Sequence, residues 1–370
     1  MPPKSASRVI VGLSGGVDSA VAALLLKEQG FEVHGLFMSN WDDEDAYCTA
    51  AQDFQDARSV ARELAIPLHR VSFAAEYRER VFAHFLAEYR AGRTPNPDVL
   101  CNREVKFGLA LRYARRLEGE WFATGHYARL LRTADGLELH KARDCGKDQT
   151  YFLHAVARLD LERVLMPIGE LQKEEVRARA RRACLPVYDK PDSSGICFIG
   201  ERPFREFLSR YLQCEPGPIE STTGMRVGTH RGLPFYTLGQ RGGLEVGGRR
   251  DSLCEPWYVA AKDTARNALI VVQGHDHPLL LTRALVTETV HWLTAPPALP
   301  CRCTVRVRHR QADQSAHLTE APGGGVHVAF DEPQRAVTPG QYAVLYDGER
   351  CMGGGVIASA VLAAAHHAAA

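Results

Sequence analysis

The chain has 370 residues, of which 45% are hydrophobic and 24% are charged, and its formal net charge is +1. These values are average for globular proteins and argue against a disordered chain. The sequence contains no run of about 18 apolar residues that could span a membrane, and the first residues lack the apolar core of a signal peptide. We therefore expect a cytoplasmic protein without membrane association. With so small a net charge, any binding to nucleic acid must come from local basic patches.

The ten cysteines contain no Cys-x-x-Cys pair. In a reducing compartment such a set is unlikely to be a disulfide framework, and the spacing does not indicate a zinc site. We expect buried thiols for most of them and no metal site made of protein ligands alone.

Strands and helices alternate in the first third of the chain. Periodicity predicts strands at 8–13, 31–38, 66–73 and 120–124, and helices at 17–29, 52–65, 75–91 and 103–117. This order is typical of a parallel α/β sheet of Rossmann-like architecture. Ligands of such sheets bind at the carboxyl ends of the strands, where Gly12, Met38 and Gly125 fall.

The later part of the chain changes in character. After predicted helices at 173–183 and 204–211, glycine and proline become frequent up to Gly248. Beyond Leu281, short alternating strands separated by turns at 322–325 and 347–348 predict a small antiparallel β-barrel. We therefore divide the chain into a catalytic nucleotide-binding domain (1–202), a small central domain (203–280), a C-terminal β-barrel (281–360) and a disordered alanine-rich tail (361–370).

A glycine-rich turn joins the first predicted strand to the first predicted helix. It consists of Gly12, Leu13, Ser14, Gly15, Gly16, Val17, Asp18 and Ser19. The first N–H groups of a helix lack intrahelical partners and lie at the positive end of its dipole, so a polyphosphate can bind there. A Walker loop is excluded because Asp18 stands where it needs Lys, and no Gly-x-Gly-x-x-Gly fingerprint is present. The Asp18 carboxylate suits a Mg²⁺ ion.

Two cysteines lie in unusual surroundings. Cys101 ends the loop Thr-Pro-Asn-Pro-Asp-Val-Leu-Cys, close to the helix predicted from Arg103, and a helix start favours a thiolate. Cys197 lies in the Ser/Gly-rich turn Asp-Ser-Ser-Gly-Ile-Cys, which predicts an exposed thiol. For either cysteine alone, packing in the core remains the alternative, and the sequence does not pair them.

The stretch 301–310 predicts a strand with one basic face. Its arginines share one parity and are Arg302, Arg306, Arg308 and Arg310. Such a face suits a phosphate backbone, and an ordinary solvated barrel face is the alternative. The predicted helix at 173–183 carries Lys173, Arg177, Arg181 and Arg182, but exposed helices are often charged without binding anything.

The motif Ser-Gly-Gly-x-Asp-Ser resembles the PP-loop of ATP pyrophosphatases, whose domain is adenine nucleotide α-hydrolase-like. Further motifs extend the similarity from about Val9 to Ile357: Thr-Pro-Asn-Pro-Asp-Val-Leu-Cys-Asn, Ala-Thr-Gly-His-Tyr-Ala, Lys-Asp-Gln-Thr-Tyr-Phe-Leu, Gly-Ile-Cys-Phe-Ile-Gly-Glu-Arg and Phe-Asp-Glu-Pro-Gln-Arg. Together they resemble the bacterial tRNA-specific 2-thiouridylases.

This resemblance implies a sulfurtransferase that uses ATP and Mg²⁺ to adenylate the C2 carbonyl oxygen of the wobble uridine of tRNA. A persulfide on Cys197 then supplies sulfur, and the products are 2-thiouridine, AMP and diphosphate. Cys101 either attacks the persulfide, which leaves a transient Cys101–Cys197 disulfide and frees sulfide, or attacks the activated base. The implied partners are the Lys, Glu and Gln tRNAs and a sulfur-donor protein of a cysteine desulfurase relay.

The resemblance also implies roles for single residues. Gly12 to Ser19, Met38 and Gly125 would bind ATP, and Asn96, Pro97 and Asp98 would surround the target base, Asp98 also taking part in catalysis with the two cysteines. Contacts to tRNA are implied for His126, Lys147, Asp148, Gln149, Arg308, His309 and Gln341. His309 stands where the family usually has Tyr; a histidine can also stack on a base, or it can be a plain surface residue.

Two other functions fit part of these observations. One is a different PP-loop adenylating enzyme, such as an amide-forming synthetase, but no recognisable ammonia source accompanies the loop and the two cysteines would have no purpose. The other is a non-catalytic RNA-binding protein, against which the intact Asp18, Ser19 and both cysteines argue.

Overall fold

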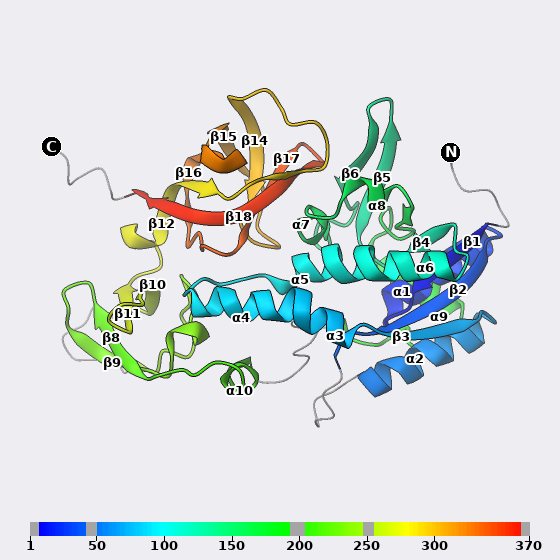
Figure 1. The fold of residues 1–370 in the computed structure, drawn as a ribbon, viewed down its shortest axis with the longest axis horizontal. Coiled ribbons are helices and arrows are strands. Elements are labelled where there is room, and N and C mark those ends of the chain that lie inside the picture. The colour runs from blue at the N-terminus through cyan, green and yellow to red at the C-terminus, as the bar shows by residue number, and fades with distance from the viewer. Residues whose placement is uncertain (1–6, 42–49, 193–203, 247–254, 364–370) are drawn as a thin grey trace.

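The computed structural model describes residues 7–41, 50–192, 204–246 and 255–363. Cys197 lies outside these ranges. The described strands form a parallel sheet, a small central sheet and a β-barrel, which lie in different parts of the molecule (Figure 1). This confirms the predicted fold class.

The parallel sheet has five strands in the order β3-β2-β1-β4-β7. Their bounds are Arg8–Gly12 (β1), Glu32–Ser39 (β2), Leu68–Ser72 (β3), Trp121–Ala123 (β4) and Val164–Leu165 (β7). The four strands predicted from periodicity are confirmed. Sequence periodicity misses β7, because a strand of two residues carries no alternation.

Helices cover both faces of this sheet. Successive residues of β1 point to opposite faces, so they show which helices pack on each face. Val9 and Val11 pack on one side with α1 (Val17–Glu28), α2 (Ala50–Glu63) and α9 (Lys173–Arg182). Ile10 packs on the other side with two continuous helical runs. The first run is α3 (Ala74–Tyr77), η1 (Arg78–Phe82) and α4 (Ala83–Arg90), and the second is α5 (Pro97–Leu100), η2 (Cys101–Ala110) and α6 (Leu111–Arg116).

The sequence pattern predicts that the second run begins at Arg103, but it begins at Pro97. Pro97 occupies the first helical position, where the N–H that proline lacks would be unsatisfied anyway. The Asn96 side chain caps the helix by accepting the Asp98 N–H at 3.2 Å. The helix that carries Cys101 therefore starts one turn before that cysteine.

The C-terminal body is a closed antiparallel barrel. The ring runs β12-β16-β15-β14-β17-β18 and closes because β18 also pairs with β12. The strand bounds are Leu281–Thr287 (β12), Cys301–Arg306 (β14), Gln314–Glu320 (β15), Val326–Arg335 (β16), Tyr342–Asp347 (β17) and Arg350–Leu362 (β18), with β13 (His291–Trp292) paired beside β18. The predicted turns connect β15 to β16 and β17 to β18. Residues 361 and 362 belong to β18, so they are not part of a disordered tail.

The central body is a four-stranded sheet in the order β10-β11-β8-β9. Its strands are Gly217–Ser221 (β8), Arg226–His230 (β9), Trp257–Asp263 (β10) and Ala268–Gln273 (β11). The preceding helix α10 (Phe204–Ser209) packs Phe207 into the aromatic cluster of the first domain. Short 3-10 turns lie at Leu233–Phe235 (η3), Pro278–Leu280 (η4) and Pro322–Gly324 (η5).

A hairpin that the sequence pattern does not predict joins the first domain to the barrel. It consists of β5 (Ala128–Thr133) and β6 (Gly136–Lys141), and β6 pairs with β18 through Leu139 and His140. Short helices α7 (Thr150–Leu153) and α8 (Arg158–Leu161) follow it. The hairpin starts just after the carboxyl end of β4, so the barrel is attached beside the edge of the sheet where ligands are expected (Figure 1).

Within the described ranges, no helix has the length and apolar character needed to cross a membrane.

Phe122 of β4 is fully buried among the helices of the second run, whereas Leu159 of α8 is 72% exposed. We expect Phe122→Ala to lower the free energy of unfolding by about 3–5 kcal/mol, because it removes a ring and leaves a cavity. Leu159→Ala is the control and should change it by less than about 0.5 kcal/mol. Urea unfolding followed by circular dichroism measures both, and equal midpoints would contradict the assignment of Phe122 to the core.

Candidate functional site

The glycine-rich turn lies at the carboxyl end of β1 and leads into α1. Gly16 precedes the helix in an extended conformation, and none of the described side chains caps the helix there. Ser19 holds the turn together, because its Oγ accepts the Ser14 N–H at 3.2 Å and donates to the Gly16 carbonyl oxygen at 3.1 Å. The first N–H groups of α1 are thus arranged for an anion.

Close packing explains why glycine is needed around this turn. A Cβ on Gly125 would lie 2.6 Å from the Ser19 nitrogen, so the segment after β4 touches the start of α1. Gly15 has φ +80°, which favours glycine, and any Cβ there would collide with the Asp53 backbone. Met38 lies beside Gly12, with its Cε 3.5 Å from where a Cβ would be. The three segments predicted to converge are therefore together.

Asp18 is the most strongly held side chain of the turn. Its carboxylate accepts the Tyr127 hydroxyl at 2.8 Å and the Lys173 ammonium at 2.7 Å. The same ammonium also pairs with Asp192 at 2.7 Å and is almost fully buried. Lys173 was expected only as one charge of a basic helix, but the structure directs it into the site.

A second lysine, Lys190, approaches the turn from the other side. Its ammonium donates to the Gly15 carbonyl oxygen at 3.1 Å and to Asp53 at 2.8 Å. Burial alone would lower the pKa of Lys190, but the hydrogen bonds that it donates to Asp53 and Asp56 raise it above its usual value. The site therefore offers two ammonium groups beside the helix start. Neither residue belongs to a recognisable local motif, and only the position of Lys190 shortly before the Cys197 turn could have drawn attention to it.

Asp192 balances several of these positive charges. Burial would raise its pKa, but hydrogen bonds from Lys147 and Lys173 lower it to about 2. The Asp192 carboxylate is therefore ionised at every physiological pH. Because its folded pKa is depressed, its contribution to stability is present above the ordinary pKa of an aspartate and is lost only as the pH falls towards 2.

The segment from Asn96 to Cys101 forms the second candidate region. Burial raises the pKa of Asp98 above its usual range, with the charge of Lys106 opposing the shift. Cys101 is 1% exposed and belongs to the hydrophobic cluster that contains Ile10 and Leu36 of the sheet. It lies in the second turn of the helix, which starts at Pro97 and not at the predicted Arg103, and a thiolate at this position stays a prediction.

The barrel reaches this region through Gln341. Its side-chain amide donates to the Thr94 carbonyl oxygen at 2.8 Å, and the Thr94 N–H donates to the Pro339 carbonyl oxygen at 3.1 Å. A small cavity of about 70 Å³ lies beside this contact and is lined by Asn96, Glu88 and Gly340 among others. Gln341 thus fixes the loop before Asn96, and its implied contact with tRNA stays a prediction.

His126 is buried between the glycine-rich turn and the second helical run. Its Nδ1 lies 2.8 Å from the Thr124 hydroxyl, and its ring centre lies 5.5 Å from that of Phe107. Burial, and then the charge of Lys106, hold its pKa well below the usual value. His126 is therefore neutral at physiological pH, and a contact with tRNA would need it to be uncovered.

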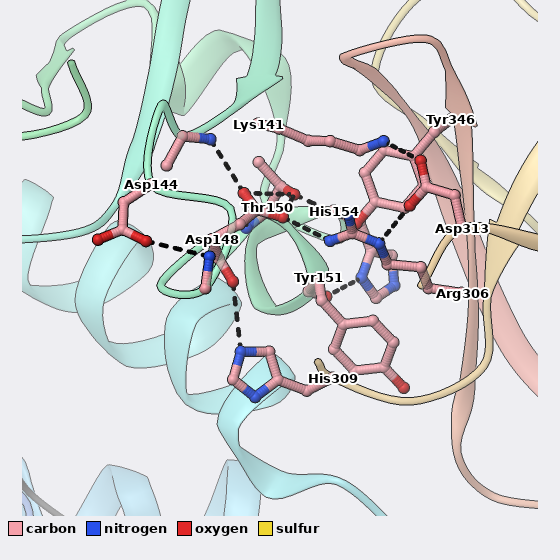
Figure 2. Close-up of polar contacts among 12 residues, drawn as sticks. Lys141, Asp144, Asp148, Thr150, Tyr151, His154, Arg306, His309, Asp313 and Tyr346 are labelled. Carbon is pink, nitrogen blue, oxygen red and sulfur yellow. Dashed lines mark hydrogen bonds and ion pairs between the residues drawn. The ribbon is translucent and has the colours of Figure 1, made fainter. Parts of the chain in front are cut away.

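Lys147, Asp148 and Gln149 point to three different parts of the protein. Lys147 donates to Asp192 at 2.6 Å, and Gln149 accepts the Tyr127 N–H at 2.9 Å. The Asp148 carboxylate is 1% exposed and accepts the Arg306 guanidinium at 2.6 Å (Figure 2). Only Asp148 is buried, since the Lys147 side chain is 32% exposed, and the contacts with tRNA implied for the three residues stay predictions.

The predicted basic face of 301–310 is wrong. The strand ends at Arg306, whose side chain is 12% exposed and lies between Asp148 and Asp313. Arg308 lies beyond the strand and donates to the carbonyl oxygens of Ala336 at 2.6 Å and Leu238 at 3.1 Å. The alternation of residues assigns the arginines to one face of a strand, but it does not predict whether another domain covers that face.

His309 packs against the first domain. Its ring centre is 4.4 Å from that of Phe152, and its Nε2 lies 3.3 Å from the Asp148 carbonyl oxygen. Burial lowers its pKa, so the ring is neutral. Stacking of this ring on a base stays a prediction.

Across the part of the chain that the structure describes, no three His, Cys, Asp or Glu side chains are grouped to hold a metal ion.

Three domain families match the chain. Residues 7–201 match the tRNA methyl transferase HUP domain, 205–273 the tRNA methyl transferase PRC-barrel domain, and 282–357 the aminomethyltransferase beta-barrel domain. These ranges contain the parallel sheet, the central sheet and the barrel, respectively.

Similar proteins cover almost the whole chain. The tRNA-specific 2-thiouridylase MnmA of Chromohalobacter salexigens is 56% identical over 96% of this chain and 93% of its own length. That of Halorhodospira halophila is 56% identical over 96% of this chain and 94% of its own length. A solved 4-thiouridine synthetase–RNA complex with bound ATP is 18% identical over 55% of this chain and 49% of that chain, with a TM-score of 0.35. The identities to the two relatives, over nearly full length, show that the chain belongs to the tRNA-specific 2-thiouridylase family.

Proposed function

We propose that this protein catalyses the ATP-dependent 2-thiolation of the wobble uridine of tRNA. Membership of the 2-thiouridylase family supports thiolation of tRNA. The observation that carries the proposal is the turn from Gly12 to Ser19, whose uncapped helix start is packed by Gly125 and flanked by Lys173 and Lys190. This is an arrangement for a polyphosphate in a chain whose relatives thiolate tRNA.

ATP would place its phosphates at the first N–H groups of α1, within reach of the two lysines. A Mg²⁺ ion bound with ATP would take oxygen ligands, and the Asp18 carboxylate is a candidate for one of them. The uridine C2 carbonyl oxygen then attacks the α-phosphorus and diphosphate leaves. This step is needed because a carbonyl oxygen is a very poor leaving group, whereas AMP is a good one.

Sulfur would arrive as a persulfide on Cys197. In one route the Cys101 thiolate attacks the inner sulfur, which forms a Cys101–Cys197 disulfide and releases hydrosulfide. Hydrosulfide adds to C2 and AMP leaves, which gives 2-thiouridine, and a reductant must reopen the disulfide before the next cycle. In the other route the Cys101 thiolate attacks C2 of the activated base and AMP leaves. A second thiol then releases hydrosulfide from the Cys197 persulfide and forms a mixed disulfide with Cys197, and this hydrosulfide displaces Cys101 from C2 to give 2-thiouridine. Cys101 is 1% exposed, so both routes need this thiol to be uncovered before it can reach the persulfide or the base.

The substrates and partners extend this proposal. The Lys, Glu and Gln tRNAs would bring the target uridine to Asn96, Pro97 and Asp98, beside the cavity that Asn96 lines. A sulfur-donor protein of a cysteine desulfurase relay would load Cys197.

Replacement of either cysteine tests the sulfur chemistry. We expect Cys101→Ser and Cys197→Ser each to abolish 2-thiouridine formation on unmodified tRNA and to leave ATP binding intact. Cys145→Ser is the matched control, because Cys145 is exposed and lies outside both candidate regions. Mass spectrometry of tRNA nucleosides, after reaction with ATP, Mg²⁺, cysteine and a cysteine desulfurase, measures the product. Normal thiolation by either variant would remove the role proposed for that cysteine.

Replacement of glycines tests the phosphate site. Gly125→Ala should weaken ATP binding by about tenfold or more, because its methyl group must displace the start of α1. Gly242→Ala is the control and should bind ATP as tightly as the unaltered protein, since Gly242 lies in the central domain and none of the described atoms is within 4 Å of the added methyl group. Calorimetric titration with ATP and Mg²⁺ gives both affinities. Equal affinities of the two variants would place the nucleotide elsewhere.

A further inference from the structure

Four charged side chains bridge the first domain and the barrel. Lys141 ends β6 and Asp148 follows it in the first domain, while Arg306 ends β14 and Asp313 precedes β15 in the barrel. Figure 2 shows them converging around Tyr346. The two positive and two negative groups balance, and none is more than 28% exposed.

Each group in this cluster is satisfied by the others. Asp148 accepts hydrogen bonds from the Ala142 N–H at 3.1 Å, the Thr150 hydroxyl at 2.9 Å and Arg306 at 2.6 Å. Asp313 accepts from Arg306 at 2.6 Å and also pairs with Lys141. Both cations lie over the Tyr346 ring, at 4.4 and 4.9 Å from its centre. A buried carboxylate with these partners cannot lose its cation without moving.

The contact continues from Asp148 to the phosphate-binding turn. Gln149 is the next residue, and it makes two hydrogen bonds with Tyr127. Its N–H donates to the Tyr127 carbonyl oxygen and its side-chain oxygen accepts the Tyr127 N–H, both at 2.9 Å. The Tyr127 hydroxyl in turn donates to Asp18 at 2.8 Å. A short chain of contacts therefore runs from Arg306 in the barrel to Asp18 in the turn.

We propose that Arg306 and Asp148 are positioning residues for the ATP site, through which the barrel fixes Gln149 and Tyr127 and thereby the orientation of Asp18. This inference rests on the proposed function, because it assumes that ATP binds at the turn. Without Arg306, the Asp148 carboxylate has to turn towards water, and the adjoining Gln149 moves with it. Tyr127 then loses its backbone partner, and Asp18 loses the hydroxyl that orients it.

Arg306→Gln tests the inference in the full-length protein. We expect the KM for ATP to rise by about tenfold, with kcat changed by less than about twofold and the KM for tRNA unchanged. Arg306→Lys keeps the charge and should restore part of the loss. Two controls should leave all three constants unchanged. Arg302→Gln removes an exposed ion pair on the same strand, and Arg350→Gln removes a pair with Glu138 at the same junction that does not involve Asp148.

A double-variant cycle tests the route of the effect. Tyr127→Phe removes only the hydroxyl that donates a hydrogen bond to Asp18, so it should raise the KM for ATP on its own. Combined with Arg306→Gln, it should raise that KM less than the product of the two single effects, because both act on the same contact. With Arg350→Gln the effects should simply multiply. Multiplication in both pairs would overturn the proposed route.

Gln149→Met covers the case in which Arg306→Gln does not fold. It keeps the Asp148–Arg306 pair and removes only the side-chain acceptor of the Tyr127 N–H, so the KM for ATP should rise. An unchanged KM for ATP in this variant would overturn the inference, as would an Arg306→Gln effect confined to the KM for tRNA. Absence of ATP-dependent thiolation in the unaltered protein would instead overturn the proposed function.

Discussion

The candidate site depends on how one carboxylate, that of Asp18, is held at the start of α1. Two parts of the chain meet on it or beside it. The segment after β4 contributes Tyr127 and packs Gly125 against the following peptide, and α9 contributes Lys173. Because Gly125 has no side chain, that segment approaches closely enough for Tyr127 to reach Asp18. The turn is thus shaped before any anion arrives, and its geometry is set by residues up to 155 positions away in the sequence.

Charge compensation is the second constraint that organises the molecule. Asp192, Asp53 and Asp56 neutralise the lysines around the turn, and Asp148 and Asp313 neutralise Lys141 and Arg306 at the junction with the barrel. Buried charges of this kind are tolerated only in complete sets, since a single unpaired ion in the interior is strongly destabilising. The positive groups near the site are consequently few in number but fixed in place.

Local patterns in the sequence predict the parallel sheet, the glycine-rich turn and the barrel hairpins, because each has its own periodicity or turn chemistry. They miss β7, the β5–β6 hairpin and the roles of Lys173 and Lys190, which depend on partners distant in sequence. The basic face fails for a related reason: Arg306 faces Asp148 of another domain and not solvent. The pairing of Cys101 with Cys197 stays a prediction, since Cys197 lies outside the described residues.

The hydrogen bonds between β6 and β18 have a consequence for modularity. Removing the barrel would strip β6 of its neighbour at Leu139 and His140 and would leave an open sheet edge next to the buried Asp148. Such an edge is a template for pairing with other chains and invites aggregation. We therefore expect that the nucleotide-binding part of this protein cannot be separated from the barrel without aggregating. A shortened or grafted version would have to provide a replacement strand and a replacement cation together.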